Sequence, residues 1–532
     1  MFEEFVSLGN WWLPSNPEVK VPGKLSFSSE KGATLELIGS FYSSQFEEIG
    51  EIENINFPSE LFSAAEISNA AEISNAASGI ALDFIKPKET IILGLLDNNE
   101  EISLFRCSGR IKNFEFVKER PTLSFNAEYI FRKIHFENEQ DIKLKSISVQ
   151  YSHLKEWIGK SGIQAFVARD ENKLWISYQP PTNIHLTRIG ELDLDITFSQ
   201  IYVNPFDFYF GAIYYKANVE QKTYLTIQNT SNQPLDECID LLINFRDLLS
   251  FAMTKATSVI EVNANTDVIH IKPVQQPNGD ITLEEELQEA QVTILFGLGN
   301  SAKTSEIKIS THEMLFLFSD VEDNLGQVFE AWIDKRKVYE PVFDLLMSTI
   351  YTSNLYLHYG FLNIVQALEA YHTNKYEGIY QDRKVYEKGL YKKFEEVLNN
   401  FPSESEDQKS GISDEFRNAL KGKLKAQTRF TLETRLKELL GEISPFLPND
   451  FIGSDSDKAE FARRSADTRN ALTHHDKEKR KQAAKGQELF QLFHTLTVIL
   501  RICLVIELNL KNDSIEALVK RSRAYQNEWR PS

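Results

Sequence analysis

The spacing of apolar residues along this chain changes near residue 305. Before that point, β-branched and aromatic residues alternate with polar ones in short runs separated by turn residues, as in Thr34–Ser40 and Leu174–Tyr178. This alternation is typical of half-buried antiparallel strands. We therefore expect residues 1–305 to form a large β-rich domain with a helix near Pro234–Thr254. We also expect its aromatic residues, Trp11 and Trp12 among them, to lie in the strand core.

After residue 305 the apolar residues follow the three- and four-residue spacing of amphipathic helices. The segments with this spacing are Asp323–Lys335, Tyr339–Tyr351, Phe361–Tyr371, Arg383–Leu398, Asp414–Lys423, Leu432–Ile443 and Gln487–Leu510. We expect residues 306–532 to form an all-α bundle, interrupted by an exposed acidic loop at residues 402–411. The fold class that follows is α+β multidomain, with the β-rich domain first.

Cysteine content and hydropathy indicate the cellular compartment of the protein. Its three cysteines are far apart and odd in number, which argues against a disulfide framework or a cysteine zinc site and fits a reducing compartment. The longest apolar run, residues 496–510, is interrupted by Arg501 and Glu507, so it predicts a buried core helix and not a membrane span. The opening residues 1–14 contain no basic residue and do not resemble a secretory signal. We expect a soluble, cytoplasmic protein without a membrane partner.

The formal net charge of −19 argues against a protein that simply coats nucleic acid, because phosphates are neutralised by Lys and Arg. The charge is compatible with a nuclease that has one basic patch, since the local electrostatic field and not the net charge guides the substrate. The segment 462–485 is such a patch. The residues that we expect to contact RNA there are Arg463, Arg464, Lys477, Arg480 and Lys481.

Within this patch, Arg469 and Asn470 precede the pair His474 and His475. Metal-independent RNA cleavage needs a base for the ribose 2′-OH, an acid for the departing 5′ oxygen and a cation for the phosphate. Histidine titrates near neutrality, and arginine offers a forked donor set that matches phosphate. We expect His474 to act as base or acid, Arg469 to stabilise the phosphate and Asn470 to orient the pair, with no metal or cofactor. His475 stays open as the alternative histidine.

Helix geometry sets a condition on this site. A five-residue step turns about 140° beyond a full circle, so Arg469 and His474 do not share a face of a regular helix. Either the helix unwinds near His474, or two chains build a composite site across a two-fold axis. The structural alternatives are a surface ion pair of Arg469 with Asp467 or Glu460, and a helix C-cap made by the histidines.

The helical half resembles a HEPN domain, whose ribonucleolytic members carry an Arg, usually a polar residue next, and a His a few positions further. Residues 469–474, RNALTH, fit this pattern, and the FLNIVQALEAYH segment resembles the family's earlier core helix. Some members have an acidic residue near the Arg-His pair, and Glu369 is its counterpart here. The opening of the ApeA N-terminal domain is resembled by three segments of the first 41 residues, GNWWLP, VPGKLSF and LELIGSF.

The resemblance to ApeA-like anti-phage proteins implies a metal-independent endoribonuclease that acts in abortive infection. It also implies tRNA as the RNA substrate, a homodimer, and an N-terminal sensor that responds to a phage-derived trigger. The rival interpretation is a catalytically silent HEPN scaffold that binds RNA or a protein partner. A metal-dependent nuclease is disfavoured, because no cluster of His, Asp and Glu has the spacing of metal ligands.

Overall fold

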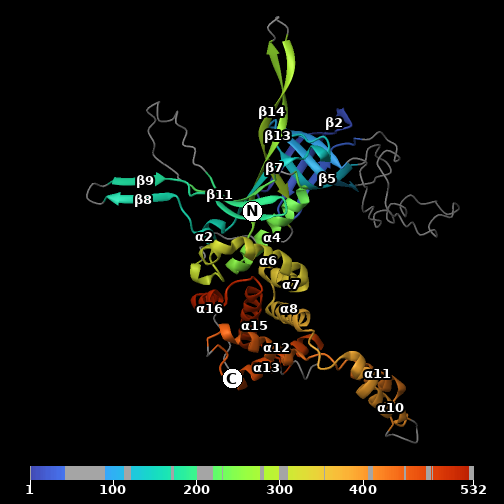
Figure 1. Cartoon of the computed structure of the whole chain (residues 1–532). Coiled ribbons are helices and arrows are strands. Elements are labelled where there is room, and N and C mark those ends of the chain that lie inside the picture. Colours follow the sequence, from blue (N-terminus) through green and yellow to red (C-terminus); the bar gives the residue numbers. More distant parts are fainter. Residues whose placement is uncertain are drawn as a thin grey trace, which may run out of the picture. The chain divides into compact units, whose positions relative to one another are not determined.

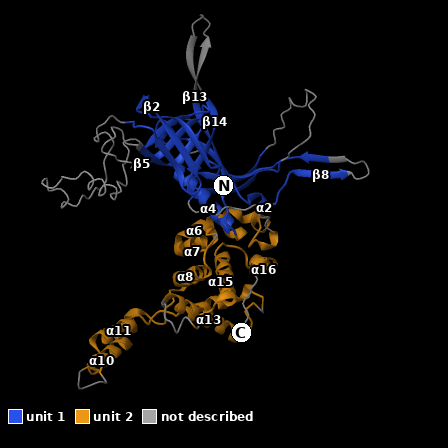
Figure 2. Ribbon diagram, turned by 180° about the vertical axis from the view of Figure 1, so that it is seen from behind, with its two compact units in different colours: residues 1–250, 255–308 blue, residues 251–254, 309–532 orange. Residues whose placement is uncertain are grey.

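The strand-type and helix-type parts of the sequence form separate units in the computed structural model (Figures 1 and 2). Unit 1 holds residues 1–250 and 255–308, and unit 2 holds residues 251–254 and 309–532. The predicted fold class is confirmed, since a β-rich region precedes a helical one. The structure describes residues 2–41, 90–112, 122–168, 173–199, 220–229, 232–275, 281–298, 310–352, 354–404, 411–448, 451–474, 481 and 483–525.

Part of unit 1 is a six-stranded antiparallel barrel. Its strands, in spatial order, are β6 (Thr122–Arg132), β3 (Gly32–Leu37), β2 (Asn16–Ser28), β1 (Phe5–Leu13), β4 (Ile91–Leu96) and β5 (Glu101–Lys112). The barrel closes because β5 also pairs with β6. Trp11 is fully buried and Trp12 nearly so, as predicted. A Cβ atom at Gly94 would lie 2.3 Å from the Trp11 ring, so only glycine leaves room for this indole.

The sheet continues beyond the barrel, because β14 pairs with the end of β6. The further strands, in spatial order, are β14 (Ile281–Phe296), β13 (Val259–Gln275), β7 (Leu144–Tyr151), β12 (Thr223–Gln228), β11 (Leu192–Phe198) and β10 (Ile184–Ile189). The short elements η2 (Glu139–Asp141) and α2 (Leu154–Ile158) flank β7 in the sequence. A separate hairpin is formed by β8 (Ile163–Ala168) and β9 (Lys173–Tyr178).

One long helix, α4 (Leu235–Met253), packs against this sheet. The Tyr151 hydroxyl donates a hydrogen bond of 2.7 Å to the carbonyl oxygen of Leu242, and the Tyr151 ring lies 5.9 Å from that of Phe245. Arg106 of β5 donates two hydrogen bonds, of 2.8 and 2.7 Å, to the Asp236 carboxylate at the start of α4. The helix is therefore fixed to both the open sheet and the barrel.

Unit 2 is helical. It begins with η4 (Thr311–Glu313), α5 (Phe318–Val321), η5 (Glu322–Asn324), α6 (Leu325–Val338), α7 (Glu340–Tyr351) and α8 (Leu357–Tyr376). It continues with α9 (Arg383–Tyr386), η6 (Glu387–Tyr391), α10 (Lys392–Asn400), α11 (Asp414–Lys425), α12 (Leu432–Ile443) and η7 (Ser444–Phe446). It ends with α13 (Asp455–His474), α15 (Gly486–Ile506), α16 (Asn512–Arg521) and η8 (Arg523–Tyr525).

The core of unit 2 is built on α15. Gly360 of α8 lets the two helices approach closely, since a Cβ atom there would lie 3.2 Å from the Phe493 ring. By length and composition α15 could cross a membrane, but 67% of its most apolar stretch is buried inside the protein. That burial is what the core helix of a soluble protein shows. It agrees with the prediction made for residues 496–510.

Candidate functional site

The structure brings Arg469 of α13 together with Glu369 of α8. The Arg469 Nη2 atom donates to both carboxylate oxygens of Glu369, at 2.6 Å each. The Nη1 atom donates to the side-chain oxygen of Asn470 at 3.0 Å. Both charged side chains are part-buried, with 30% of Arg469 and 26% of Glu369 exposed. Arg469 is therefore held in one orientation by a residue 100 positions earlier, and not by Asp467 or Glu460.

Among the residues that the structure describes, part of the Arg469 guanidinium has no acceptor. The group has five N–H donors, and the contacts to Glu369 and Asn470 use at most three of them. Among the described residues, nothing accepts a hydrogen bond from the Arg469 Nε atom. The remaining donors are thus available to an anionic oxygen, and the carboxylate fixes the plane in which they are presented.

His474 is the last residue of α13. The helix is regular up to this point, and the Thr473 hydroxyl donates to the carbonyl oxygen of Arg469 at 2.9 Å. Arg469 and His474 are therefore separated by about 140° around the helix axis, as the sequence indicated. His475, Lys477 and Arg480 lie outside the described residues.

The chain returns to α13 soon after these histidines. The backbone N–H of Ala484 donates to the Thr468 hydroxyl at 3.1 Å, and Ala483, Ala484 and Thr468 are all buried. Ala484 therefore lies against the helix that carries Arg469. Of the two arrangements that the sequence left open, a helix unwound before His474 is not what the structure shows.

The predicted RNA contacts on α13 have carboxylate partners within the protein. Arg464 donates to both oxygens of Glu488, at 2.5 and 2.7 Å, and these hydrogen bonds raise its pKa. Arg463 lies 4.0 Å from Glu460 and 3.9 Å from Asp467. Lys481 is exposed. Arg464 therefore ties α13 to α15, and its RNA-binding role stays a prediction.

A second polar cluster, which the sequence did not single out, lies next to Glu369. His372 is fully buried one helical turn further along α8. Its Nε2 atom lies 2.7 Å from the Glu438 carboxylate, and its Nδ1 atom lies 3.0 Å from Nη1 of Arg435. The spacing of Glu369 and His372 on one helix, and of Arg435 and Glu438 on another, was the available signal.

These contacts define the state of the His372 ring. A guanidinium can only donate, so Nδ1 must accept and Nε2 must carry the proton that is donated to Glu438. The imidazole is therefore neutral. Burial lowers the pKa of His372 below its ordinary value of 6.5, and the charge of Arg435 lowers it further, against the opposing effect of Glu438.

This lowered pKa predicts a pH dependence of stability. Below pH 6.5 the unfolded chain protonates His372 while the folded protein resists, so the free energy of unfolding falls as pH drops. One proton contributes a slope of at most about 1.4 kcal/mol per pH unit. Urea unfolding between pH 7 and pH 5 should show a shallower slope for His372→Gln than for the wild type. The exposed His312→Gln is the control, and equal slopes for all three proteins would contradict the assignment.

The charge of Glu507, which interrupts the apolar run, is compensated. Its carboxylate accepts hydrogen bonds from Lys335 at 2.6 Å, from Lys375 at 2.9 Å and from the Tyr371 hydroxyl at 2.8 Å. Burial raises the pKa of Glu507, but these three donors outweigh it and hold the pKa below its usual value. The network joins α8 and α6 to the C-terminal end of α15.

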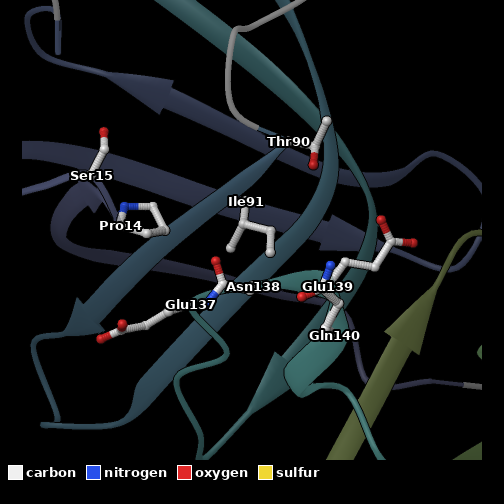
Figure 3. A pocket seen from close by; sticks show the side chains of 8 residues that line it. All are labelled: Pro14, Ser15, Thr90, Ile91, Glu137, Asn138, Glu139 and Gln140. Atoms are coloured by element: carbon white, nitrogen blue, oxygen red, sulfur yellow. The ribbon is translucent and has the colours of Figure 1, made fainter.

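Unit 1 carries a surface depression of about 490 Å³, which is shown in Figure 3. It is lined by Pro14, Ser15, Thr90, Ile91, Glu137, Asn138, Glu139 and Gln140. None of the residues predicted as catalytic or RNA-binding lines it. Over the described ranges, no group of three His, Cys, Asp or Glu side chains could hold a metal ion.

Fold and site together define a two-part protein, with a β-barrel unit followed by a HEPN-type helical unit. ApeA N-terminal domain 1 matches residues 7–332, and Apea-like HEPN matches residues 362–514. The chain therefore belongs to the ApeA family, whose HEPN domain suggests a ribonuclease-type role in defence against phage. No curated protein and no solved structure shows a significant match to it.

Proposed function

We propose that this chain is a cytoplasmic anti-phage endoribonuclease that cuts RNA, with tRNA as the expected substrate. The observation that carries the proposal is the Glu369–Arg469 pair, which orients the Arg469 guanidinium on the helix that ends at His474. Membership in a family whose HEPN domains are generally ribonucleases supports it.

In the proposed reaction the ribose 2′-OH attacks the adjacent phosphorus, and the 5′ oxygen of the next nucleotide leaves. One histidine takes the proton from the 2′-OH and a second returns a proton to the leaving oxygen, which yields a 2′,3′-cyclic phosphate and a 5′-OH. Arg469 stabilises the charge on the phosphate oxygens, oriented by Glu369 and Asn470. The chemistry needs no metal.

A homodimer supplies the second histidine. Because His474 lies about 140° around α13 from Arg469, a site that combines both residues is built most simply from two chains across a two-fold axis. The N-terminal unit then acts as the sensor that releases the nuclease when a phage-derived trigger is present.

The experiment compares two alanine variants with RNA in buffer containing EDTA. His474→Ala should lose at least about 10²-fold in cleavage rate, because it removes the proton-transfer group. His475→Ala is the matched neighbour and should keep most of the activity. A full rate for His474→Ala would transfer the role to His475 or refute the site, and the double variant decides between these. If wild-type protein retained RNA without breaking it, the silent scaffold would replace the nuclease.

A further inference from the structure

A helical arm is inserted between α8 and α12. It comprises residues 379–429, with α9, the π-helical turn η6, α10 and α11, and these helices lie away from the rest of the bundle in both views (Figures 1 and 2). We call the part next to the bundle, residues 379–393 and 420–429, the arm root. The arm is not needed to complete the core, because α8, α12, α13 and α15 pack on one another without it.

The arm root carries a strong positive charge in an acidic protein. It has nine basic residues and two acidic ones, a net charge of +7 where the whole chain has −19. The basic residues are Arg383, Lys384, Lys388, Lys392, Lys393, Lys421, Lys423, Lys425 and Arg429. The described outer part of the arm is acidic instead, because it has five carboxylates and a single basic residue, Arg417. The charge is thus concentrated on the side nearest the bundle.

Within the part of the chain that the structure describes, most of this charge has no carboxylate partner. Glu387 pairs with Arg383 at 2.9 Å and lies 3.8 Å from Lys425. The other seven basic side chains have no carboxylate within ion-pair distance among the described residues. An ordinary solvated helix face mixes both signs. A run of unpaired like charges repels itself and is neutralised best by a polyanion.

Arg435 of α12 fixes the arm root next to the Arg469 site. Its guanidinium donates to the carbonyl oxygens of Gly378 and Phe430, the residues at which the chain enters and leaves the arm. It also donates to the Thr373 hydroxyl at 2.8 Å, and Thr373 in turn donates to the carbonyl oxygen of Glu369 at 2.7 Å. Glycine is required at Gly378, where φ is 58° and a Cβ atom would lie 2.5 Å from Arg435 Nη1.

We propose that the arm root binds the phosphate backbone of single-stranded RNA and leads it to Arg469. This inference rests on the proposed function and names how its substrate is held. Lys384, Lys388 and Lys392 recur at four-residue intervals through α9, η6 and α10, and all three are exposed. Successive phosphates can contact such a row, while sequence-independent charge contacts give affinity without base readout.

The test uses a fluorescein-labelled 30-nucleotide single-stranded RNA and full-length protein with Arg469→Ala, so that the RNA stays intact. In this background K384Q/K388Q/K392Q is compared with K31Q/K143Q/K511Q, which removes the same charge from three exposed lysines elsewhere. Fluorescence anisotropy should show at least a tenfold weaker Kd for the arm variant at about 0.1 M salt. The slope of log Kd against log salt should fall by about 2, since each phosphate contact contributes about 0.7.

Equal affinities and salt slopes for the two triple variants would overturn the proposal. So would a change in molecular mass of the arm variant at unchanged RNA affinity, because the arm root would then bind protein. RNA binding by the arm root and RNA cleavage by the protein are tested separately. If wild-type protein failed to cut RNA but bound it through the arm root, the binding surface would stand and the nuclease would not.

Discussion

Replacing Arg469 with alanine is expected to lower the rate of RNA cleavage by about 10²- to 10³-fold, the cost of removing one donor group that meets developing charge on the reacting oxygens. The loss should appear mainly in kcat, because the proposed contact of Arg469 is with charge that develops only in the transition state. Single-turnover cleavage of a labelled RNA in EDTA measures it. Arg469→Lys keeps the charge but loses the planar fork, and it should recover only part of the rate.

The matched control for this prediction is Arg523→Ala, an exposed arginine of η8 in the same unit. It should cleave at the wild-type rate. Helical ellipticity should be unchanged in both alanine variants, since Arg469 is part-buried and its removal leaves Glu369 in contact with solvent. An Arg469→Ala protein that is folded and cuts as fast as the Arg523→Ala protein would remove Arg469 from the mechanism.

Replacing Phe343 with alanine is expected to lower the free energy of unfolding of unit 2 by about 3–5 kcal/mol. Phe343 of α7 is 1% exposed, and its ring meets that of Trp332 edge to face at 4.8 Å. Trp332 contacts Phe251, so the three rings form one aromatic cluster of the unit. The substitution removes a buried ring and leaves a cavity that rigid helices cannot close. Urea unfolding followed at 222 nm measures the loss.

Phe416→Ala is the control for this stability prediction, because it makes the same chemical change at a side chain that is 53% exposed. Its effect should stay within about 1 kcal/mol. Phe416 lies on α11 of the arm, so this variant also shows whether the arm contributes to the stability of the bundle. A loss for Phe343→Ala no larger than that for Phe416→Ala would mean that the aromatic cluster is not packed as described.

The spacing of apolar residues predicted the positions of several helices. Leu432–Ile443 is helical over the same residues that the apolar spacing indicated, and the helix expected near Pro234–Thr254 spans Leu235–Met253. The closure of the barrel was not predictable, because the pairing of β5 with β6 is a long-range choice that no local period reports. Trp175 shows the same limit, since it is 64% exposed on the β8–β9 hairpin although alternation alone places aromatic residues in the core.

The site was predictable only where a motif marked it. Arg469, Asn470 and Glu369 were singled out from the sequence, and the structure brings their side chains together. Arg435 and His372 were not, because a buried polar cluster depends on helices that are far apart in the sequence. The arm root could not be predicted from the sequence for another reason. Its two halves are separated by the acidic outer arm, and they form one basic surface only when the chain folds back.

Breakage of RNA by Arg469 and His474 can be tested directly in cells. The measurement is sequencing of small RNA, with end chemistry recorded, from cells that briefly express the wild-type or the His474→Ala protein. We expect new breaks with 2′,3′-cyclic phosphate and 5′-OH ends in the cells with wild-type protein alone, concentrated in tRNA. Intact RNA in both cultures, at rest and under phage challenge, would contradict it.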